Sequence, residues 1–150
     1  MNTTLLVAEE PSPSRDALRQ FLSGCGFDVV TADDGLDCLA RLRELEPELL
    51  VADWELPWGG AAAVVAYLNQ SHFEFVMPVV LVIGDAPASL LSQRTGVPRS
   101  SCFPKPVPKE RLLDQVGLAV ALIDLRNNTE SASNLGATRL QEEPAVDLVS

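Results

Sequence analysis

The segment Leu49-Leu50-Val51-Ala52-Asp53-Trp54-Glu55-Leu56-Pro57 places a short apolar run directly before an acidic residue and a turn. A continuous apolar run of this length is typical of a parallel strand that is buried on both faces. The same pattern occurs near the N-terminus, where Leu5-Leu6-Val7-Ala8 is followed at once by Glu9 and Glu10. The two segments therefore predict two buried strands, each of which leads into carboxylates.

Further strand and helix patterns alternate with these two strands along the chain. Strands are expected at 27–31, 78–83 and 100–103. Two helices are expected to follow a cap, at Ser12 or Ser14 and at Asp33 or Asp34, and three more at 61–70, 88–95 and 108–125. Five strands alternating with five helices predict an α/β fold, in which helices cover both faces of a doubly wound five-stranded parallel sheet.

Charge and composition exclude several classes of function. The 150 residues contain 11 Lys and Arg against 21 Asp and Glu, which gives a net charge of −10. Such a chain lacks the basic surface with which proteins bind nucleic acids and anionic membranes. No basic signal-peptide start and no apolar segment long enough to span a bilayer is visible. Three scattered cysteines suit a reducing compartment. We expect a soluble, cytoplasmic protein with no nucleic-acid or membrane partner.

The C-terminal part of the sequence differs from the rest. Residues 127–150 are polar and carry one Arg against four acidic residues, a net charge of −3, so we expect one folded domain over 1–126 and a polar acidic tail over 127–150. The last expected helix holds more leucine, isoleucine and valine than one buried face requires. This excess indicates a second buried face, covered either by the tail or by a second copy in a homodimer.

The residues that follow the strands combine carboxylates with one ammonium group. In a parallel α/β sheet, ligands bind beyond the carboxyl ends of the strands. Glu9, Glu10 and Asp53 are expected there, and Lys105 follows the fifth strand. Gathered carboxylates need a cation, and oxygen ligands suit Mg²⁺. A lysine beside them suits a phosphoryl group. The chemistry that fits this set is phosphoryl transfer to a carboxylate.

Four motifs in this order resemble the receiver domain of two-component response regulators, over roughly residues 3 to 125. They are the acid pair Glu9-Glu10 with Arg15 five residues on, the segment Asp53-Trp54-Glu55-Leu56-Pro57, the strand 78–82, and Lys105-Pro106. The resemblance implies a flavodoxin-like fold with strand order 2-1-3-4-5. It also implies a cis peptide bond between Lys105 and Pro106.

The resemblance further implies what each residue does. Asp53 would accept a phosphoryl group from a histidine kinase or phosphotransfer protein, and Lys105 would pair with the phosphoryl oxygens. Mg²⁺ would be held by Glu9, Glu10, Asp53 and the backbone carbonyl of Glu55. The protein would then be a stand-alone receiver that acts by protein–protein contact. Its only catalysis would be self-catalysed phosphoryl transfer to Asp53 and hydrolysis from it.

Two positions depart from the family pattern. Ile83 stands where the family has a Thr or Ser whose hydroxyl bonds the phosphoryl group, and Cys102 stands where it has the switch aromatic. The acid pair is Glu-Glu rather than a pair that contains Asp. An alternative interpretation is therefore a pseudo-receiver, a module of the same fold that binds partners without phosphorylation.

Overall fold

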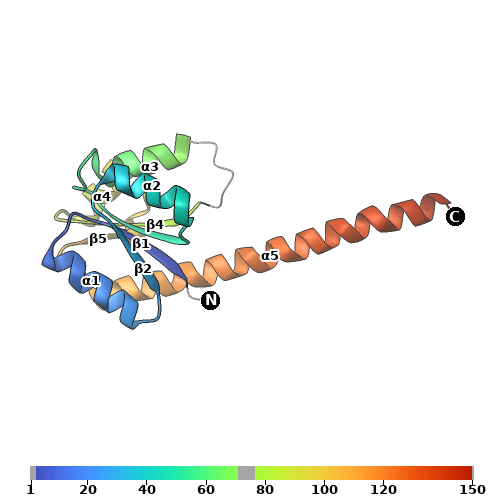
Figure 1. Ribbon diagram of the computed structural model, residues 1–150, viewed down its shortest axis with the longest axis horizontal. Helices are drawn as coiled ribbons and strands as arrows, with labels where there is room; N and C mark the ends of the chain where they lie inside the picture. The colour runs from blue at the N-terminus through green and yellow to red at the C-terminus, as the bar shows by residue number, and fades with distance from the viewer. Residues whose placement is uncertain (1–2, 71–76, 150) are drawn as a thin grey trace. The chain divides into compact units, whose positions relative to one another are not determined.

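The computed structural model describes residues 3–70 and 77–149, with side chains as far as residue 129 (Figure 1). His72, the histidine of the chain, lies outside the described residues. The strands are β1 (Thr4–Ala8), β2 (Asp28–Ala32), β3 (Leu49–Asp53), β4 (Val79–Gly84) and β5 (Cys102–Pro104). The helices are α1 (Pro13–Gly24), α2 (Gly35–Leu45), α3 (Gly60–Gln70), α4 (Ala88–Thr95), a short 3₁₀ turn (Arg99–Ser101) and α5 (Lys109–Val149).

The five strands form one parallel sheet in the order β2-β1-β3-β4-β5. This confirms the predicted α/β fold, including the flavodoxin-like strand order. Because β1 and β3 are neighbouring parallel strands, their carboxyl ends lie side by side. Their paired residues Ala8 and Ala52 are directly followed by Glu9 and Asp53. The topology therefore brings together two acidic residues that are 44 positions apart in the sequence.

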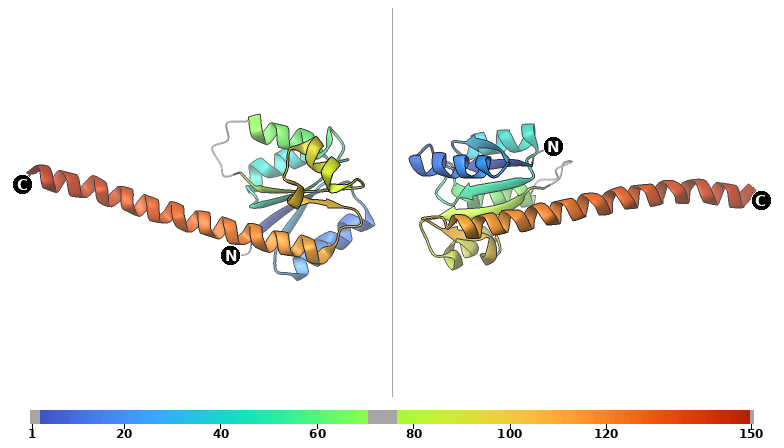
Figure 2. Two further views of the ribbon diagram at one scale, coloured as in Figure 1. Left: turned by 180° about the vertical axis from the view of Figure 1, so that it is seen from behind. Right: turned by 90° about the horizontal axis from the view of Figure 1, so that it is seen from below.

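Helices cover both faces of the sheet, and α1 lies on the opposite side from α2 and α3 (Figures 1 and 2). Alternate strand residues point to each face because successive side chains in a strand point in opposite directions. Leu6, Leu50 and Val82 pack in one cluster with buried residues of α2, α3 and α4. Their neighbours Leu5 and Leu49 are also fully buried. Burial on both faces explains why the strands read as continuous apolar runs.

The structure selects between the caps that the sequence left open. Ser12 caps α1, where its Oγ accepts a hydrogen bond from the Arg15 N–H at 3.0 Å. Asp34 caps α2, where its Oδ1 accepts from the Asp37 N–H at 2.8 Å. These side chains satisfy N–H groups that have no partner within their helices, and so they fix where each helix begins.

The last helix is longer than the sequence pattern indicated. We expected it to end at residue 125, whereas α5 continues to Val149. Residues 127–143 contain no proline, the residue that a helix interior tolerates least, so the polar composition alone did not fix where the helix ends. The chain forms two compact units, Met1–Val116 and Gly117–Ser150. The division into a receiver-like domain over 1–126 and a tail over 127–150 remains a prediction. Among the described helices, none is long and apolar enough to cross a bilayer.

Candidate functional site

The expected site residues lie around one cavity beyond the carboxyl ends of the strands. Glu9 directly follows β1, Asp53 is the last residue of β3, and Lys105 directly follows β5. The cavity is lined by Glu9, Glu10, Pro11, Ser12, Ser14, Asp53, Glu55 and Lys105. Every site residue that the sequence indicated therefore borders the same space. Ser12 and Ser14 also line the cavity, which the sequence analysis did not predict.

Lys105 bridges two carboxylates in this cavity. Its Nζ donates to Asp53 Oδ2 at 2.6 Å and to Glu9 Oε1 at 2.8 Å. The lysine side chain is 26% exposed, and both carboxylates are buried. Burial alone would lower the pKa of Lys105, but the hydrogen bonds with Asp53 and Glu9 outweigh it, so the pKa is raised above 10.5. Lys105 therefore carries its positive charge at neutral pH.

The loop after β3 holds the Asp53 carboxylate in place from the other side. The Glu55 N–H donates to Asp53 Oδ1 at 2.9 Å, and the Leu56 N–H donates to the Asp53 carbonyl at 3.1 Å. With Lys105 on Oδ2, both side-chain oxygens of Asp53 accept a hydrogen bond. These contacts fix one orientation of the carboxylate toward the cavity. Such pre-positioning is what a nucleophilic carboxylate needs.

The donor set fits a divalent cation that keeps several waters. Glu9 Oε2 is buried and has no hydrogen-bond partner, which is a costly state for a carboxylate oxygen. Two buried carboxylates share a single ammonium, so the cavity retains negative charge. Mg²⁺ is commonly held by one or two carboxylates together with water. Among the described residues, no three or more His, Cys, Asp or Glu side chains are grouped so that they could hold a metal ion by themselves. Glu10 is exposed.

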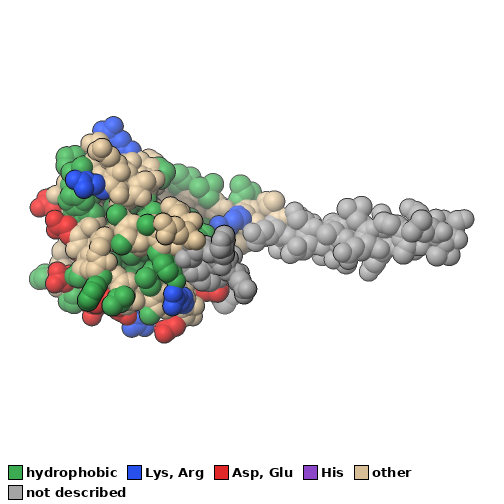
Figure 3. Space-filling model, turned by 90° about the horizontal axis from the view of Figure 1, so that it is seen from above, with side chains coloured by type: hydrophobic (Ala, Val, Ile, Leu, Met, Phe, Trp, Pro, Cys, Tyr) green, Lys and Arg blue, Asp and Glu red, His purple; other side chains and the backbone are tan. Residues whose placement is uncertain are grey.

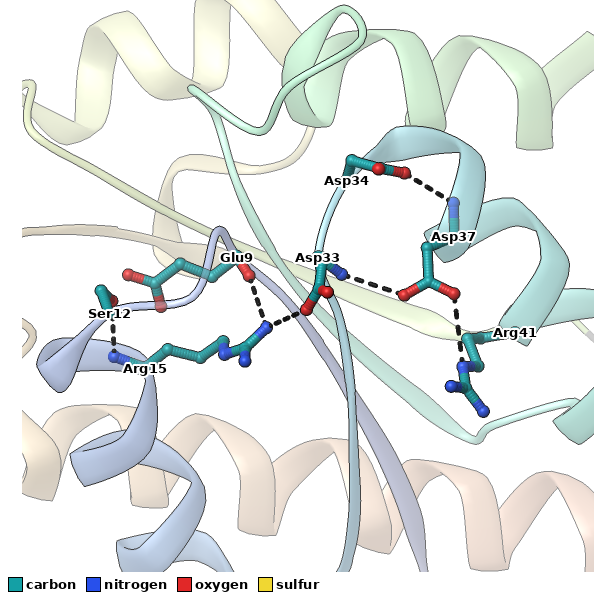
Figure 4. Close-up of polar contacts among 7 residues, drawn as sticks. All are labelled: Glu9, Ser12, Arg15, Asp33, Asp34, Asp37 and Arg41. Atoms are coloured by element: carbon teal, nitrogen blue, oxygen red, sulfur yellow. Dashed lines mark hydrogen bonds and ion pairs between the residues drawn. The ribbon is translucent and has the colours of Figure 1, made fainter.

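Arg15 joins the loop after β1 to the loop after β2 (Figure 4). Its Nη1 donates to the Glu9 carbonyl at 3.1 Å and to Asp33 Oδ1 at 2.6 Å. The Glu9 N–H donates to the Ala32 carbonyl at 3.1 Å. The backbone of Glu9 is therefore held at both its N–H and its carbonyl, and both contacts lead to the junction of residues 32 and 33.

The same contacts continue onto α2. Asp37 Oδ2 accepts from the Asp33 N–H at 3.1 Å, and Asp37 Oδ1 lies 3.5 Å from Arg41 Nε. Figure 4 shows Asp37 on α2 between Asp33 on the preceding loop and Arg41 on the same helix. The sequence contained Arg15 as part of a motif but gave no indication of its partners, because Asp33 lies 18 residues away.

Ile83 and Cys102 occupy the two positions that depart from the family pattern. Ile83 is paired with Asp53 across β3 and β4 and is fully buried, so an apolar side chain stands at the end of β4. Cys102 is buried in β5, with its thiol near the carbonyls of Val97 and Pro98. Burial raises the pKa of the Cys102 thiol.

Trp54 packs against the residue that follows Ile83. A Cβ placed on Gly84 would lie 2.3 Å from Cδ1 of the Trp54 ring and 2.9 Å from Leu91 Cδ2. The absence of a side chain at Gly84 thus makes room for the indole at the end of β4. The Trp54 indole therefore lies next to the site and can report on it by fluorescence.

The family model for the response regulator receiver domain matches residues 5–117. The chain belongs to this family. The peptide bond between Lys105 and Pro106 is cis, as the resemblance implied.

Relatives of known sequence are response regulators. The receiver-domain chain is 30% identical over 82 residues to the phosphate regulon transcriptional regulatory protein PhoB of Escherichia coli, a match that covers 55% of this chain and 36% of PhoB. It is 29% identical over 131 residues to the C4-dicarboxylate transport transcriptional regulatory protein DctD of Pseudomonas aeruginosa, with 85% of this chain and 28% of DctD covered. The chain therefore spans about a third of the length of these relatives.

Solved structures share the fold. The chemotaxis response regulator CheY4 of Vibrio cholerae matches with a TM-score of 0.64 at 21% identity, covering 79% of this receiver domain chain and 99% of CheY4. The signal receiver domain of a DNA binding response regulator protein from Colwellia psychrerythraea matches with a TM-score of 0.69 at 17% identity, covering 80% and 99%. These likenesses agree with the sheet order and the helix placement described above.

Proposed function

We propose that this receiver domain accepts a phosphoryl group on Asp53 from a histidine kinase or a phosphotransfer protein, and that it acts by protein–protein contact in the cytoplasm. The observation that carries the proposal is the Lys105 bridge between Asp53 and Glu9 beside a cavity open to a donor. The family match supports the same conclusion. The chemistry is limited to phosphorylation of Asp53 and loss of that group by hydrolysis.

The transfer itself needs little from the protein beyond positioning and charge. A carboxylate oxygen of Asp53 attacks the phosphorus of a phosphohistidine, a P–O bond forms, and the P–N bond breaks. The imidazole leaves and takes up a proton. Water later attacks the phosphorus of the acyl phosphate and releases inorganic phosphate, which restores the carboxylate. Lys105 supplies positive charge where phosphoryl oxygens would lie, which favours the transfer electrostatically.

We assign the metal-holding role to Glu9, Asp53, the Glu55 carbonyl and, at the rim, Glu10. The buried Glu9 Oε2 without a partner supports this assignment. When bound, Mg²⁺ would neutralise charge on the transferring phosphoryl group. Trp54 fluorescence should change on titration with Mg²⁺, measured in a Trp58→Phe background so that one tryptophan remains. Asp53→Asn should weaken the response, and a response identical to that of the parent would contradict the metal assignment.

The experiment that tests phosphorylation is intact-mass measurement after treatment with acetyl phosphate and Mg²⁺. The protein should gain one phosphoryl group, and Asp53→Asn should gain none. Asp85→Asn is a matched control, because Asp85 is an exposed carboxylate after β4 that makes no part of the cavity lining. If the wild-type protein stays unmodified while a histidine kinase or phosphotransfer partner still binds it, the pseudo-receiver interpretation replaces this one.

The proposal includes self-association through the second unit. Leu118, Leu122 and Leu125 recur at helical spacing on α5 and are exposed. Side chains four and three residues apart lie on the same face of a helix, so the three leucines form one apolar stripe. A second copy would cover this stripe. Sedimentation of wild type and Leu122→Ser should show a dimer that the substitution weakens, and equal sedimentation of the two would contradict it.

A further inference from the structure

Trp58 is presented on a rigid turn that leaves its ring in solvent. Its side chain is 70% exposed, and its φ of 70° lies in the left-handed region that bulky residues rarely adopt. Gly59 and Gly60 follow with φ values of 94° and 71°. Holding a non-glycine residue in this region strains the backbone, and such strain gathers at functional positions.

Neighbouring backbone leaves this turn no room to relax. The Gly35 N–H donates to the Pro57 carbonyl at 2.8 Å, and a Cβ on Gly35 would lie 2.9 Å from the Trp58 carbonyl oxygen. A Cβ on Gly60 would lie 2.0 Å from the Trp54 carbonyl oxygen. The Trp58 backbone is therefore fixed against the start of α2. A rigid, exposed aromatic residue loses little entropy on binding, which is the property of an interface anchor.

Apolar surface continues from Trp58 onto the two adjoining helices. Leu36, which follows Gly35 at the start of α2, is 60% exposed. The helix α3 begins two residues after Trp58 and contains no charged residue, and its Ala63 and Ala66 are exposed. Figure 3 shows the molecule from the side on which α2 and α3 lie, with many apolar side chains on this face. Exposed apolar surface with an aromatic centre is typical of protein interaction sites.

Acidic residues stand next to Trp58 and Leu36 in the sequence, and the basic residues of α2 lie further along that helix. Arg41 lies 3.5 Å from Asp37, and Arg43 lies over the Tyr67 ring of α3. Asp34 and Asp37 flank Leu36, and the exposed Glu55 precedes Trp58 by three residues. Figure 3 shows Asp and Glu side chains at the left margin of this face, with Lys and Arg side chains above them. An acidic border selects a basic partner by charge.

We propose that Trp58 and Leu36, with the exposed start of α3, form a docking surface for a partner-protein segment in which apolar side chains alternate with Lys or Arg. The apolar side chains would cover Trp58 and Leu36. The basic side chains would face Asp34 and Glu55. Trp58 and Leu36 do not line the cavity at Asp53, although Glu55 borders both, and the inference does not depend on phosphorylation.

Charge also argues against a second copy as the occupant. In a two-fold dimer the same patch meets itself, so the acidic borders of both copies would face each other. Like charges placed opposite each other across an interface disfavour association. The net charge of −10 adds to this repulsion.

The test uses the full chain and synthetic probe peptides that carry a dye. One amphipathic peptide consists of Leu and Lys, a second has Ser in place of Leu, and a third has Glu in place of Lys. Fluorescence anisotropy should show that the Leu/Lys peptide binds and that binding weakens as salt is added. Trp58→Asn should weaken it by about tenfold or more, as expected for a central aromatic anchor. Asparagine tolerates positive φ, so this variant should fold.

Two further variants complete the comparison. Leu36→Ser should weaken the same binding, whereas Leu45→Ser, at the opposite end of α2, should leave it unchanged. The proposal is overturned if the Ser/Lys or Leu/Glu peptide binds as tightly as the Leu/Lys peptide, or if Trp58→Asn binds like wild type. It is also overturned if wild type self-associates and Trp58→Asn does not, because the occupant is then a second copy.

Discussion

The ammonium of Lys105 lies 2.6 Å from Oδ2 of Asp53, and it is also the hydrogen-bond partner of the buried Glu9 carboxylate. Lys105→Met keeps much of the length of the side chain but leaves two neighbouring carboxylates without a cation. We expect a loss of about 1–3 kcal/mol in the free energy of unfolding, because a buried acceptor would lose its partner. Urea denaturation without divalent cations measures this loss.

The same variant should respond more strongly to Mg²⁺ than wild type does. A divalent cation would replace the missing positive charge beside Asp53 and Glu9, so added Mg²⁺ should restore part of the lost stability. Arg111→Met, on the first turn of α5 and exposed, is a matched control for loss of a basic side chain. If Mg²⁺ stabilises wild type and Lys105→Met equally, the cation does not occupy the space beside the lysine.

The raised pKa of Lys105 predicts a loss of stability at alkaline pH. Burial opposes the charged form, but the hydrogen bonds with Asp53 and Glu9 favour it more, so the folded-state pKa lies above the usual value of 10.5. The stabilising contribution is complete below the unfolded-state pKa and is lost as pH rises through the folded-state pKa. The difference in unfolding free energy between wild type and Lys105→Met should therefore stay constant near neutral pH and shrink above 10.5. A difference that already shrinks as pH rises from neutral, well below 10.5, would contradict this.

Arg15 should control how firmly the metal-holding loop is fixed. Its guanidinium joins the Glu9 carbonyl to Asp33, and the arginine side chain is 12% exposed whereas that of Asp33 is 60% exposed. In Arg15→Ala the Asp33 carboxylate returns to water at little cost, and the Glu9 carbonyl loses its anchor. We expect a loss of about 1 kcal/mol in stability and faster hydrogen exchange at the Glu9 amide.

The outer part of the same network supplies the control for Arg15. Arg41 pairs with Asp37 at the exposed surface of α2, at 3.5 Å. Arg41→Ala should therefore leave Glu9 exchange and Mg²⁺ affinity unchanged, because exposed ion pairs on helices contribute little. If both variants change Glu9 exchange alike, the effect travels through α2 and not through the Glu9 carbonyl.

Local patterns in the sequence were enough to predict the fold and the position of the site. The apolar runs before Glu9 and Asp53 indicated buried parallel strands, and strand ends in such a sheet converge at one edge. Contacts between distant residues were not predictable. The pairing of Lys105 with Glu9 joins residues that are 96 positions apart. The sequence analysis predicted that Lys105 would pair with a phosphoryl group, but it did not predict this contact with Glu9. The sequence also did not decide where some helices begin and end. The helix α5, for example, extends to Val149 and not to the predicted residue 125.

Cysteine burial illustrates the same limit. Composition indicated a reducing compartment for the three cysteines but not which of them are buried: Cys25 is exposed at the end of α1, whereas Cys38 and Cys102 are buried. Burial, with the nearby Asp37 and Asp34, raises the pKa of the Cys38 thiol to about 12. Which face of a helix end meets solvent depends on the elements packed against it, and a single sequence does not specify that packing.

The substitution Ile83→Thr should raise the phosphorylated fraction of Asp53. Ile83 stands opposite Asp53 in the register of β3 and β4, at the position where the family carries a hydroxyl. A new hydroxyl donor to a charged phosphoryl oxygen would contribute roughly 1.5–3 kcal/mol. The steady-state fraction under acetyl phosphate, measured by intact mass, should therefore increase. Val82→Thr is the matched control, because Val82 points to the opposite face of the sheet in the α2–α4 cluster. An unchanged fraction in a folded Ile83→Thr protein would show that residue 83 does not reach the phosphoryl group.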